Sequence, residues 1–295
     1  MTLTIGEEPA AGESSLRVLE GLDRALESVD ELVPMDEARF LATHLIYEGR
    51  SNQRRRILEW FDHEVTPNNS TNETFDILSV GCGGGHLDVP IASALFDRKV
   101  RLRYAGVDPN RVECESFTRL WRSAGLDDSC LDVVAESFED FEASRSFDLI
   151  HLVHCLYYMP EPMDALERSR RLLACGGRLV VFQAPREELN ELSVRFYDKQ
   201  YDRPTLFSED LSSLLDKRGW PYERQRIDAS LEASPLLNGD SETRLALRDF
   251  IIQVDGRRLP EAVQELVSRY LRSILVRDGE NHRIAHPVDV FVIAE

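Results

Sequence analysis

Residues 75–89 are FDILSVGCGGGHLDV, a short apolar run followed by a cluster of glycines. The apolar half predicts a strand that ends at Gly81, and the residues after Gly85 predict a helix. Glycines in such a turn let the backbone approach a ligand closely. The dinucleotide-binding pattern G-x-G-x-x-G would need its third glycine where this chain has His86. The loop instead follows G-x-G-x-G with Gly83 in the middle, which makes a nicotinamide reductase a distant alternative.

Strands and helices alternate outward from this loop. Apolar runs predict further strands at 102–107, 131–135, 147–153, 178–182, 220–227 and 288–294. Helical spacing predicts helices within the first seventy residues, near 91–95, and at 112–124, 162–173, 187–201, 206–218, 242–252 and 261–275. Gly176-Gly177 predicts a turn before the strand at 178–182. The alternation predicts an α/β protein whose parallel sheet has helices on both faces.

The composition is that of an acidic, folded protein. The 295 residues include 53 acids and 35 bases, so the formal net charge is −18. This charge argues against a general affinity for nucleic acid or anionic lipid, and no apolar run approaches the ~20 residues of a membrane helix. The five cysteines are scattered without a CxxC pair, which argues against a disulfide scaffold or a zinc site. We therefore expect a cytoplasmic protein with no metal, no nucleic-acid partner and no membrane contact.

A carboxylate follows the second predicted strand. Asp108 comes after Leu102–Val107, downstream of the glycine loop. A carboxylate at that place can accept hydrogen bonds from both hydroxyls of a ribose. A glycine cluster alone is also consistent with a tight turn, but the order strand, loop, helix, strand and acid favours a cofactor that contains a nucleoside.

The loop resembles the first motif of class I S-adenosylmethionine-dependent methyltransferases, where it surrounds the methionine part of the cofactor. Three stretches resemble the histamine N-methyltransferase family: ILSVGCGGGHLDV (77–89), FDLIHLVHCLYYMPEPMDAL (147–166) and DVFVIAE (289–295). The resemblance spans about 35–295. It implies a doubly wound, mostly parallel, seven-stranded sheet with a helical N-terminal segment and a helical insertion before the last strand. It also implies S-adenosyl-L-methionine as the cofactor and a monomeric protein.

The resemblance and the composition together suggest five consecutive parts. They are a loose tail and helix (1–34), an N-terminal helical lid (35–70), a Rossmann-like domain that binds S-adenosylmethionine (71–229), a helical substrate-side insertion (230–285) and the last strand of the sheet (286–295).

Site residues follow from the resemblance position by position. The implied cofactor-binding residues are Gly81, Gly83, Gly85, Asp108, Ser137, Phe138 and Val153. Three polar substrate contacts of the family differ in this chain: Gln53 stands in place of a Glu, His154 in place of a Gln and His286 in place of an Asn. Without the Glu, a cationic amine would lose its carboxylate partner, which argues against histamine itself as the substrate.

Aromatic side chains are suited to a methyl-transfer pocket. Methyl transfer from a sulfonium is an in-line displacement, so the protein mainly aligns the reactants and excludes water. Aromatic rings exclude water and hold planar or cationic groups. Tyr157 and Tyr158, which match the family's pocket tyrosines, and Phe196 and Tyr201 are the candidates. Simple packing is the alternative for each.

Histidines are the candidate catalytic bases. An amine or imidazole acceptor must lose a proton, and the ordinary pKa of histidine, ~6.5, suits that task. His154 and His286 are therefore the predicted catalytic residues, with a buried structural histidine as the alternative for each. His151 lies three positions before His154 on one strand, so it faces the opposite side and is predicted to be structural. Arg54 begins a cluster of three arginines, which predicts either a clamp for a carboxylate or a solvated helix face.

The expected function is S-adenosylmethionine-dependent methylation of a small molecule at an imidazole or amine nitrogen. A first alternative is methylation of a carboxylate or hydroxyl on a peptide or natural product, which the neutral Gln53 and the neighbouring arginines favour. A second alternative is a protein that binds the cofactor without catalysis.

Overall fold

The computed structural model describes residues 14–65, 74–201 and 204–294 and divides them into two compact units. Unit 1 comprises the described residues of 1–50, 187–204 and 231–285, and unit 2 comprises those of 51–186, 205–230 and 286–295. This division differs from the five consecutive parts expected from the sequence. Of the predicted lid at 35–70, residues 66–70 lie outside the described residues and the remainder is shared between the units, while the helix after residue 187 belongs to unit 1. No helix of the described residues is long and apolar enough to cross a membrane.

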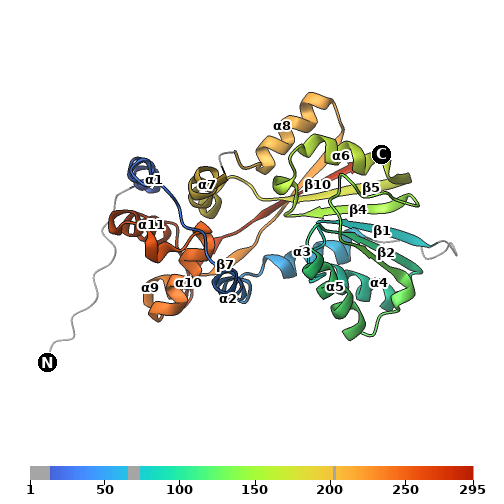
Figure 1. Cartoon of the computed structure of the whole chain (residues 1–295), viewed down its shortest axis with the longest axis horizontal. Helices are drawn as coiled ribbons and strands as arrows, with labels where there is room; N and C mark the ends of the chain where they lie inside the picture. The colour runs from blue at the N-terminus through green and yellow to red at the C-terminus, as the bar shows by residue number, and fades with distance from the viewer. Residues whose placement is uncertain (1–13, 66–73, 202–203, 295) are drawn as a thin grey trace. The chain divides into compact units, whose positions relative to one another are not determined.

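Unit 2 is a sheet with helices on both faces (Figure 1). Its strands are β1 (Phe75–Val80), β2 (Leu102–Val107), β3 (Leu131–Val134), β4 (Phe147–Val153), β5 (Leu173–Gln183), β6 (Tyr222–Ile227) and β10 (Val288–Ala294). Its helices are α3 (Gln53–Glu64), α4 (Asp88–Asp97), α5 (Arg111–Ser123), α6 (Pro162–Arg171) and α8 (Ser208–Arg218), with short 3₁₀ turns η1 (Asp128–Cys130) and η2 (Leu156–Tyr158).

The strand order places the predicted site at the carboxyl ends of the central parallel strands of this sheet. The order is β3-β2-β1-β4-β5-β10-β6. β1 pairs in parallel with both β2 and β4, while β10 is antiparallel to β5 and β6. The chain moves outward from β1 in one direction and then returns to β4 on its other side, which is the topological switch point where α/β sheets bind ligands. The predicted doubly wound, mostly parallel, seven-stranded sheet is confirmed.

Two hydrophobic clusters, one on each face, hold the helices of unit 2 to the sheet. Successive residues of β1 alternate between them: Ile77 belongs to the cluster with Ile57 of α3, and Leu78 belongs to the cluster with Leu166 of α6. Ile77 and Leu78 are completely buried. Near-continuous apolar strands of this kind are expected where helices cover both faces of a parallel sheet.

The start of β5 differs from the prediction. The strand begins at Leu173 rather than at 178, so the predicted turn at Gly176-Gly177 is wrong. The register against β4 shifts between Phe147 and Leu149, and Gly176 adopts a φ of 77°. These glycines therefore form an irregularity inside a strand, which is a second common role of glycine.

Unit 1 contains helices and a small sheet. Its elements are α1 (Ser15–Glu27), α2 (Glu37–Glu48), α7 (Glu188–Tyr201), β7 (Ser230–Glu232), α9 (Pro235–Asn238), α10 (Ser241–Ile252), η3 (Gly256–Arg258), α11 (Glu261–Ser273), β8 (Val276–Asp278) and β9 (Asn281–Ala285). The strands form a sheet in the order β7-β9-β8. The two main helices between residues 230 and 285 were predicted, but these three strands were not.

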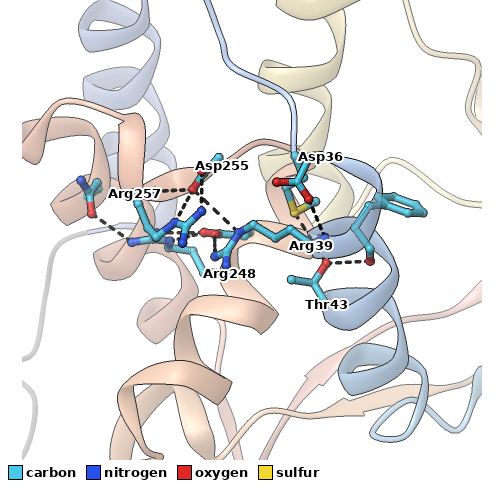
Figure 2. Close-up of polar contacts among 10 residues, drawn as sticks. Asp36, Arg39, Thr43, Arg248, Asp255 and Arg257 are labelled. Carbon is cyan, nitrogen blue, oxygen red and sulfur yellow. Dashed lines mark hydrogen bonds and ion pairs between the residues drawn. The ribbon is translucent and has the colours of Figure 1, made fainter.

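A buried group of charges lies inside unit 1 (Figure 2). Asp249 of α10 is completely buried. Its Oδ1 accepts hydrogen bonds from Nε and Nη2 of Arg248 at 3.0 and 2.8 Å, and its Oδ2 accepts one from Arg39 of α2. Beside them, the hydrogen bond from the Arg257 guanidinium lowers the pKa of Asp255 to about 2. Side chains from α2, α10 and η3 thus satisfy one another's charges.

Candidate active site

The glycine loop depends on glycine at three positions. Gly81, Gly83 and Gly85 have φ angles of 67°, 51° and 74°, a region that other residues rarely adopt. A Cβ at Gly81 would stand 2.5 Å from Cβ and 2.9 Å from Sγ of Cys155, and one at Gly85 would overlap the ring of Phe117. The start of the loop therefore packs directly against the segment that follows β4.

Gly83 of the glycine loop and Asp108, which follows β2, together fit a cofactor. A Cβ added at Gly83 would meet nothing within 4 Å, so open space lies beside this backbone. The Gly83 N–H donates to Oδ2 of Asp108 at 3.0 Å, and the Asn110 N–H donates to Oδ1 of the same carboxylate at 2.8 Å. An acid fixed beside an accessible glycine backbone can hold the ribose of S-adenosylmethionine. The residues present fit this cofactor.

Replacing Asp108 with Ala is expected to weaken binding of S-adenosylmethionine by about 1–3 kcal/mol, because the ribose loses an acceptor and the Gly83 N–H loses its partner. Isothermal titration calorimetry measures this change. Asp132→Ala, which removes an exposed acid from β3, serves as the control and should bind normally. Unchanged affinity of the Asp108 variant would remove this residue from the site.

His154 has an unusual backbone conformation directly after β4. Its φ is 51°, in the left-handed region that costs a non-glycine residue free energy. Its N–H donates to the carbonyl of Phe182 on β5 at 3.1 Å, which keeps the segment tied to the sheet. Such conformations concentrate at active sites, where the surrounding structure enforces them. The predicted base is therefore held at the carboxyl edge of the sheet, next to the glycine loop.

The structure brings His154, Gln53 and His286 together. Oε1 of Gln53 lies 2.9 Å from Nε2 of His154. The other end of the same amide, Nε2, donates to the carbonyls of His286 at 2.8 Å and Pro287 at 3.4 Å. Nδ1 of His286 lies 3.2 Å from Oγ of Ser51. Gln53 is only 7% exposed. Its amide thus bonds to protein groups, which favours a role in support of His154 over the predicted direct contact with substrate.

The tyrosines after β4 form an aromatic pair. The rings of Tyr157 and Tyr158 lie 4.5 Å apart, centroid to centroid, at an interplanar angle of 60°. Tyr158 is 60% exposed and Tyr157 is half-buried. Both follow Val153, the last residue of β4, so the pair lies at the same edge of the sheet as the glycine loop. Their predicted role in lining the pocket stays a prediction.

The remaining predicted contacts have different surroundings. Ser137 donates from Oγ to Asp140 at 2.9 Å, whereas Phe138 is buried and lies beneath the guanidinium of Arg168. Phe196 and Tyr201 belong to α7 of unit 1. Phe196 is completely buried in the hydrophobic core of that unit, which favours the packing alternative, while Tyr201 is exposed.

The arginine cluster is also partly explained by its own helix. Arg55 and Arg56 both form ion pairs with Glu59 one turn further along α3, at 3.1 Å for Arg56. This arrangement is typical of a solvated helix face. Arg54 is half-buried at the start of the same helix, close in sequence to Gln53, and stays a candidate for contact with an acidic group on the substrate.

His151 and Cys155 belong to the interior of unit 2. Nε2 of His151 lies 2.9 Å from the hydroxyl of Tyr104, which donates to Oδ1 of Asp88 at 2.9 Å. All three are buried, which agrees with the predicted structural role of His151. Burial raises the pKa of the Cys155 thiol to about 12, so this thiol is protonated and donates to the carbonyl of Val80 at 3.1 Å. No group of three or more metal-binding side chains occurs among the described residues.

The buried His151 predicts a pH dependence of stability. Burial lowers its pKa in the folded protein, and the nearby Asp88 only partly opposes this effect. Between that lowered pKa and the unfolded value of ~6.5, the unfolded chain binds more protons, so the free energy of unfolding falls as the pH drops below ~6.5. His151→Gln is expected to flatten this dependence. Urea unfolding of both proteins at pH 7.5 and 5.5 measures it, and equal losses on acidification would contradict the assignment.

Comparisons with known proteins show the family to which the chain belongs. A family model described as a methyltransferase domain matches residues 49–225, more than half of the chain. Histamine N-methyltransferase of Danio rerio is 23% identical over 265 residues, covering 80% of this chain and 88% of the relative. A structure from Bacillus halodurans, assigned as a methyltransferase, has a TM-score of 0.54 at 15% identity and covers 80% of this chain and 97% of that chain. The plantazolicin methyltransferase BamL, solved with a triazolic desmethylPZN analogue and SAH, has a TM-score of 0.50 at 15% identity and covers 96% of this chain and 99% of that chain. The chain belongs to the methyltransferase domain family and is a class I S-adenosylmethionine-dependent methyltransferase.

Proposed function

We propose that this methyltransferase modifies a nitrogen of a small imidazole or amine and that His154 accepts the proton that the nitrogen releases. One observation carries the proposal: His154 has a strained backbone conformation beside the glycine loop, and its imidazole forms a hydrogen bond with a buried amide. A histidine with an ordinary pKa near ~6.5 suits an acceptor that is protonated in water. The similarity to histamine N-methyltransferases supports nitrogen as the acceptor atom.

The residues around the loop have separate tasks in this proposal. S-adenosylmethionine supplies a methyl group already activated by the sulfonium charge. Gly83 leaves its backbone accessible to this cofactor and Asp108 binds the ribose. The Tyr157–Tyr158 pair covers the site with apolar surface and excludes water from it. His154 accepts the proton, which keeps the acceptor nitrogen neutral and nucleophilic.

A second acceptor class is favoured by a specific feature of α3. The helix presents the neutral Gln53 followed by Arg54, where an enzyme for cationic amines would gain from a carboxylate. An arginine suits an acidic substrate, since its guanidinium pairs with carboxylates. The fold likeness to BamL, solved with a triazolic desmethylPZN analogue, is consistent with methylation of a carboxylate or hydroxyl on a peptide or natural product.

One assay separates these possibilities. The full chain is incubated with methyl-labelled S-adenosylmethionine and a panel of imidazoles, primary and secondary amines, and carboxylic acids. On an imidazole or amine without a hydroxyl group, label that resists mild base identifies N-methylation, whereas label released as methanol identifies a methyl ester. Base-resistant product from imidazoles or amines is the expected result. Base-labile product alone would replace the nitrogen acceptor with a carboxylate, and no transfer to any compound would favour a protein that binds the cofactor without catalysis.

A further inference from the structure

We propose that Gln53 is a positioning residue that holds the neutral His154 imidazole in the tautomer protonated at Nε2, so that Nδ1 is the ring atom that takes up the acceptor's proton. This inference rests on the proposed function, because it assigns the proton transfer to one atom of His154. It changes the role of Gln53 from a substrate contact to a partner of the base.

The orientation of the Gln53 amide follows from its two carbonyl neighbours. A carbonyl oxygen accepts hydrogen bonds and cannot donate them. The carbonyls of His286 and Pro287 lie 2.8 and 3.4 Å from one end of the amide, so this end must be the NH₂ group. The reversed amide would place its own oxygen against two carbonyl oxygens. Hydrogen-bond networks of this kind are the basis for assigning amide orientations.

The amide in turn fixes the proton on His154. With its NH₂ group directed at the two carbonyls, Gln53 presents only Oε1 to the imidazole, at 2.9 Å from Nε2. That oxygen accepts and cannot donate, so Nε2 of His154 must carry a hydrogen. A neutral imidazole has one N–H, and its lone pair in the ring plane is therefore on Nδ1. The direction of the bond thus names Nδ1 as the basic atom.

Gln53 is well placed to hold this arrangement. It is the first residue of α3, it is 7% exposed, and its backbone N–H donates to Oγ of Ser51 at 3.2 Å. Ser51 also lies 3.2 Å from Nδ1 of His286, whose backbone carbonyl accepts from Gln53. The start of α3 and the residues before β10 therefore jointly fix the position of the Gln53 amide.

The choice of an amide rather than a carboxylate has a chemical consequence. A carboxylate beside Nε2 would stabilise the protonated imidazolium and would be repelled by the two carbonyl oxygens. The amide orients the ring without adding negative charge. It selects the tautomer that leaves the lone pair on Nδ1, as hydrogen-bonded partners of histidine do.

Nitrogen NMR of histidine-labelled full-length protein tests the assignment directly. Long-range ¹H–¹⁵N spectra distinguish the two tautomers, and His154→Asn identifies the signals. The wild-type protein is expected to show Nε2 protonated and Nδ1 unprotonated at pH 8. Gln53→Met, which keeps the length of the side chain, is expected to give a mixture of tautomers. Gln225→Met is the matched control, because it removes another amide of unit 2, the one that accepts from Trp60 at 2.6 Å, and it should leave the His154 signals unchanged.

Kinetics then connect the tautomer to catalysis. Gln53→Met is expected to lower kcat about 10- to 100-fold, as loss of an orienting partner typically does, with unchanged affinity for S-adenosylmethionine. A wild-type ring protonated at Nδ1, a Gln53→Met spectrum identical to the wild type, or an unchanged kcat in that variant would each overturn the proposal. The wild-type spectrum needs only His154→Asn for its assignment, so it is decisive even if Gln53→Met does not fold. Failure of the proposed function would look different: the predicted tautomer would be present, but the wild-type protein would methylate no nitrogen.

Discussion

Replacing His154 with Asn is expected to lower kcat by about 10²- to 10⁴-fold, the usual contribution of a general base. The substitution removes the imidazole but not the backbone geometry that the segment needs. Asparagine is one of the few residues that tolerate positive φ, and His154 has a φ of 51°. The fold and the affinity for S-adenosylmethionine should therefore persist. Initial rates with the best acceptor of the panel and calorimetry with the cofactor measure the two effects separately.

The control for this variant is His63→Asn, which alters an exposed histidine of α3 in the same unit. It should retain full activity. His154→Gly is a useful companion, because glycine adopts positive φ without strain and supplies no imidazole. Both His154 variants are expected to unfold at about the wild-type temperature while losing turnover. A near-normal rate in either variant would return His154 to a structural role.

Replacing Asp249 with Ala is expected to lower the free energy of unfolding by about 3–5 kcal/mol. The carboxylate is completely buried and accepts hydrogen bonds from Arg248 and Arg39. Its removal would leave the guanidinium of Arg248, which is only 7% exposed, without its main counter-charge. The cost arises from the uncompensated buried charge and not from the attraction alone. Chemical denaturation of the purified protein measures the change.

Two further variants test whether the loss of stability comes from this cluster and whether Arg39 and Asp249 are coupled. Glu27→Ala removes an exposed acid from α1 of the same unit and should change the stability by less than about 0.5 kcal/mol. Arg39→Met combined with Asp249→Ala should lose less than the sum of the two single variants, since removing one partner already disrupts the pair. Additive losses would show that Arg39 and Asp249 act independently.

The sequence predicts the central part of the fold well because the local signals agree there. Residues 75–89 combine an apolar strand with glycines whose positive φ angles only that residue adopts easily, and the following strands are apolar because both faces are covered. The strands of unit 1 give no such signal. Residues 276–285 are VRDGENHRIA, mostly polar and exposed, so neither alternation nor an apolar run reveals β8 and β9. Gly176-Gly177 misled the prediction because glycine marks both turns and irregular strands.

The site was predictable in its residue types but not in its connections. Gly83 and Asp108 follow from the order of elements, and the structure joins them by a hydrogen bond. Gln53 and His154 are separated by 101 positions, and no spacing rule connects them. The positive φ of His154 has no sequence signature, because histidine occurs in every backbone region. The contact of Cys155 with Gly81 was also missed, because no spacing rule connects these distant positions. A small residue beside a glycine turn is nevertheless compatible with such close packing.

The position of β10 has a consequence for synthesis on the ribosome. Among the strands of the described residues, β6 has only β10 as a neighbour in the sheet, and β10 lies some sixty residues further along the chain. During translation, residues 222–227 therefore emerge well before their partner and must wait while residues 231–285 of unit 1 are made. The nascent chain can assemble β1 to β5 early, but that sheet ends at an open edge until β10 inserts between β5 and β6. Completion of the methyltransferase sheet therefore has to follow the synthesis of residues 231–285.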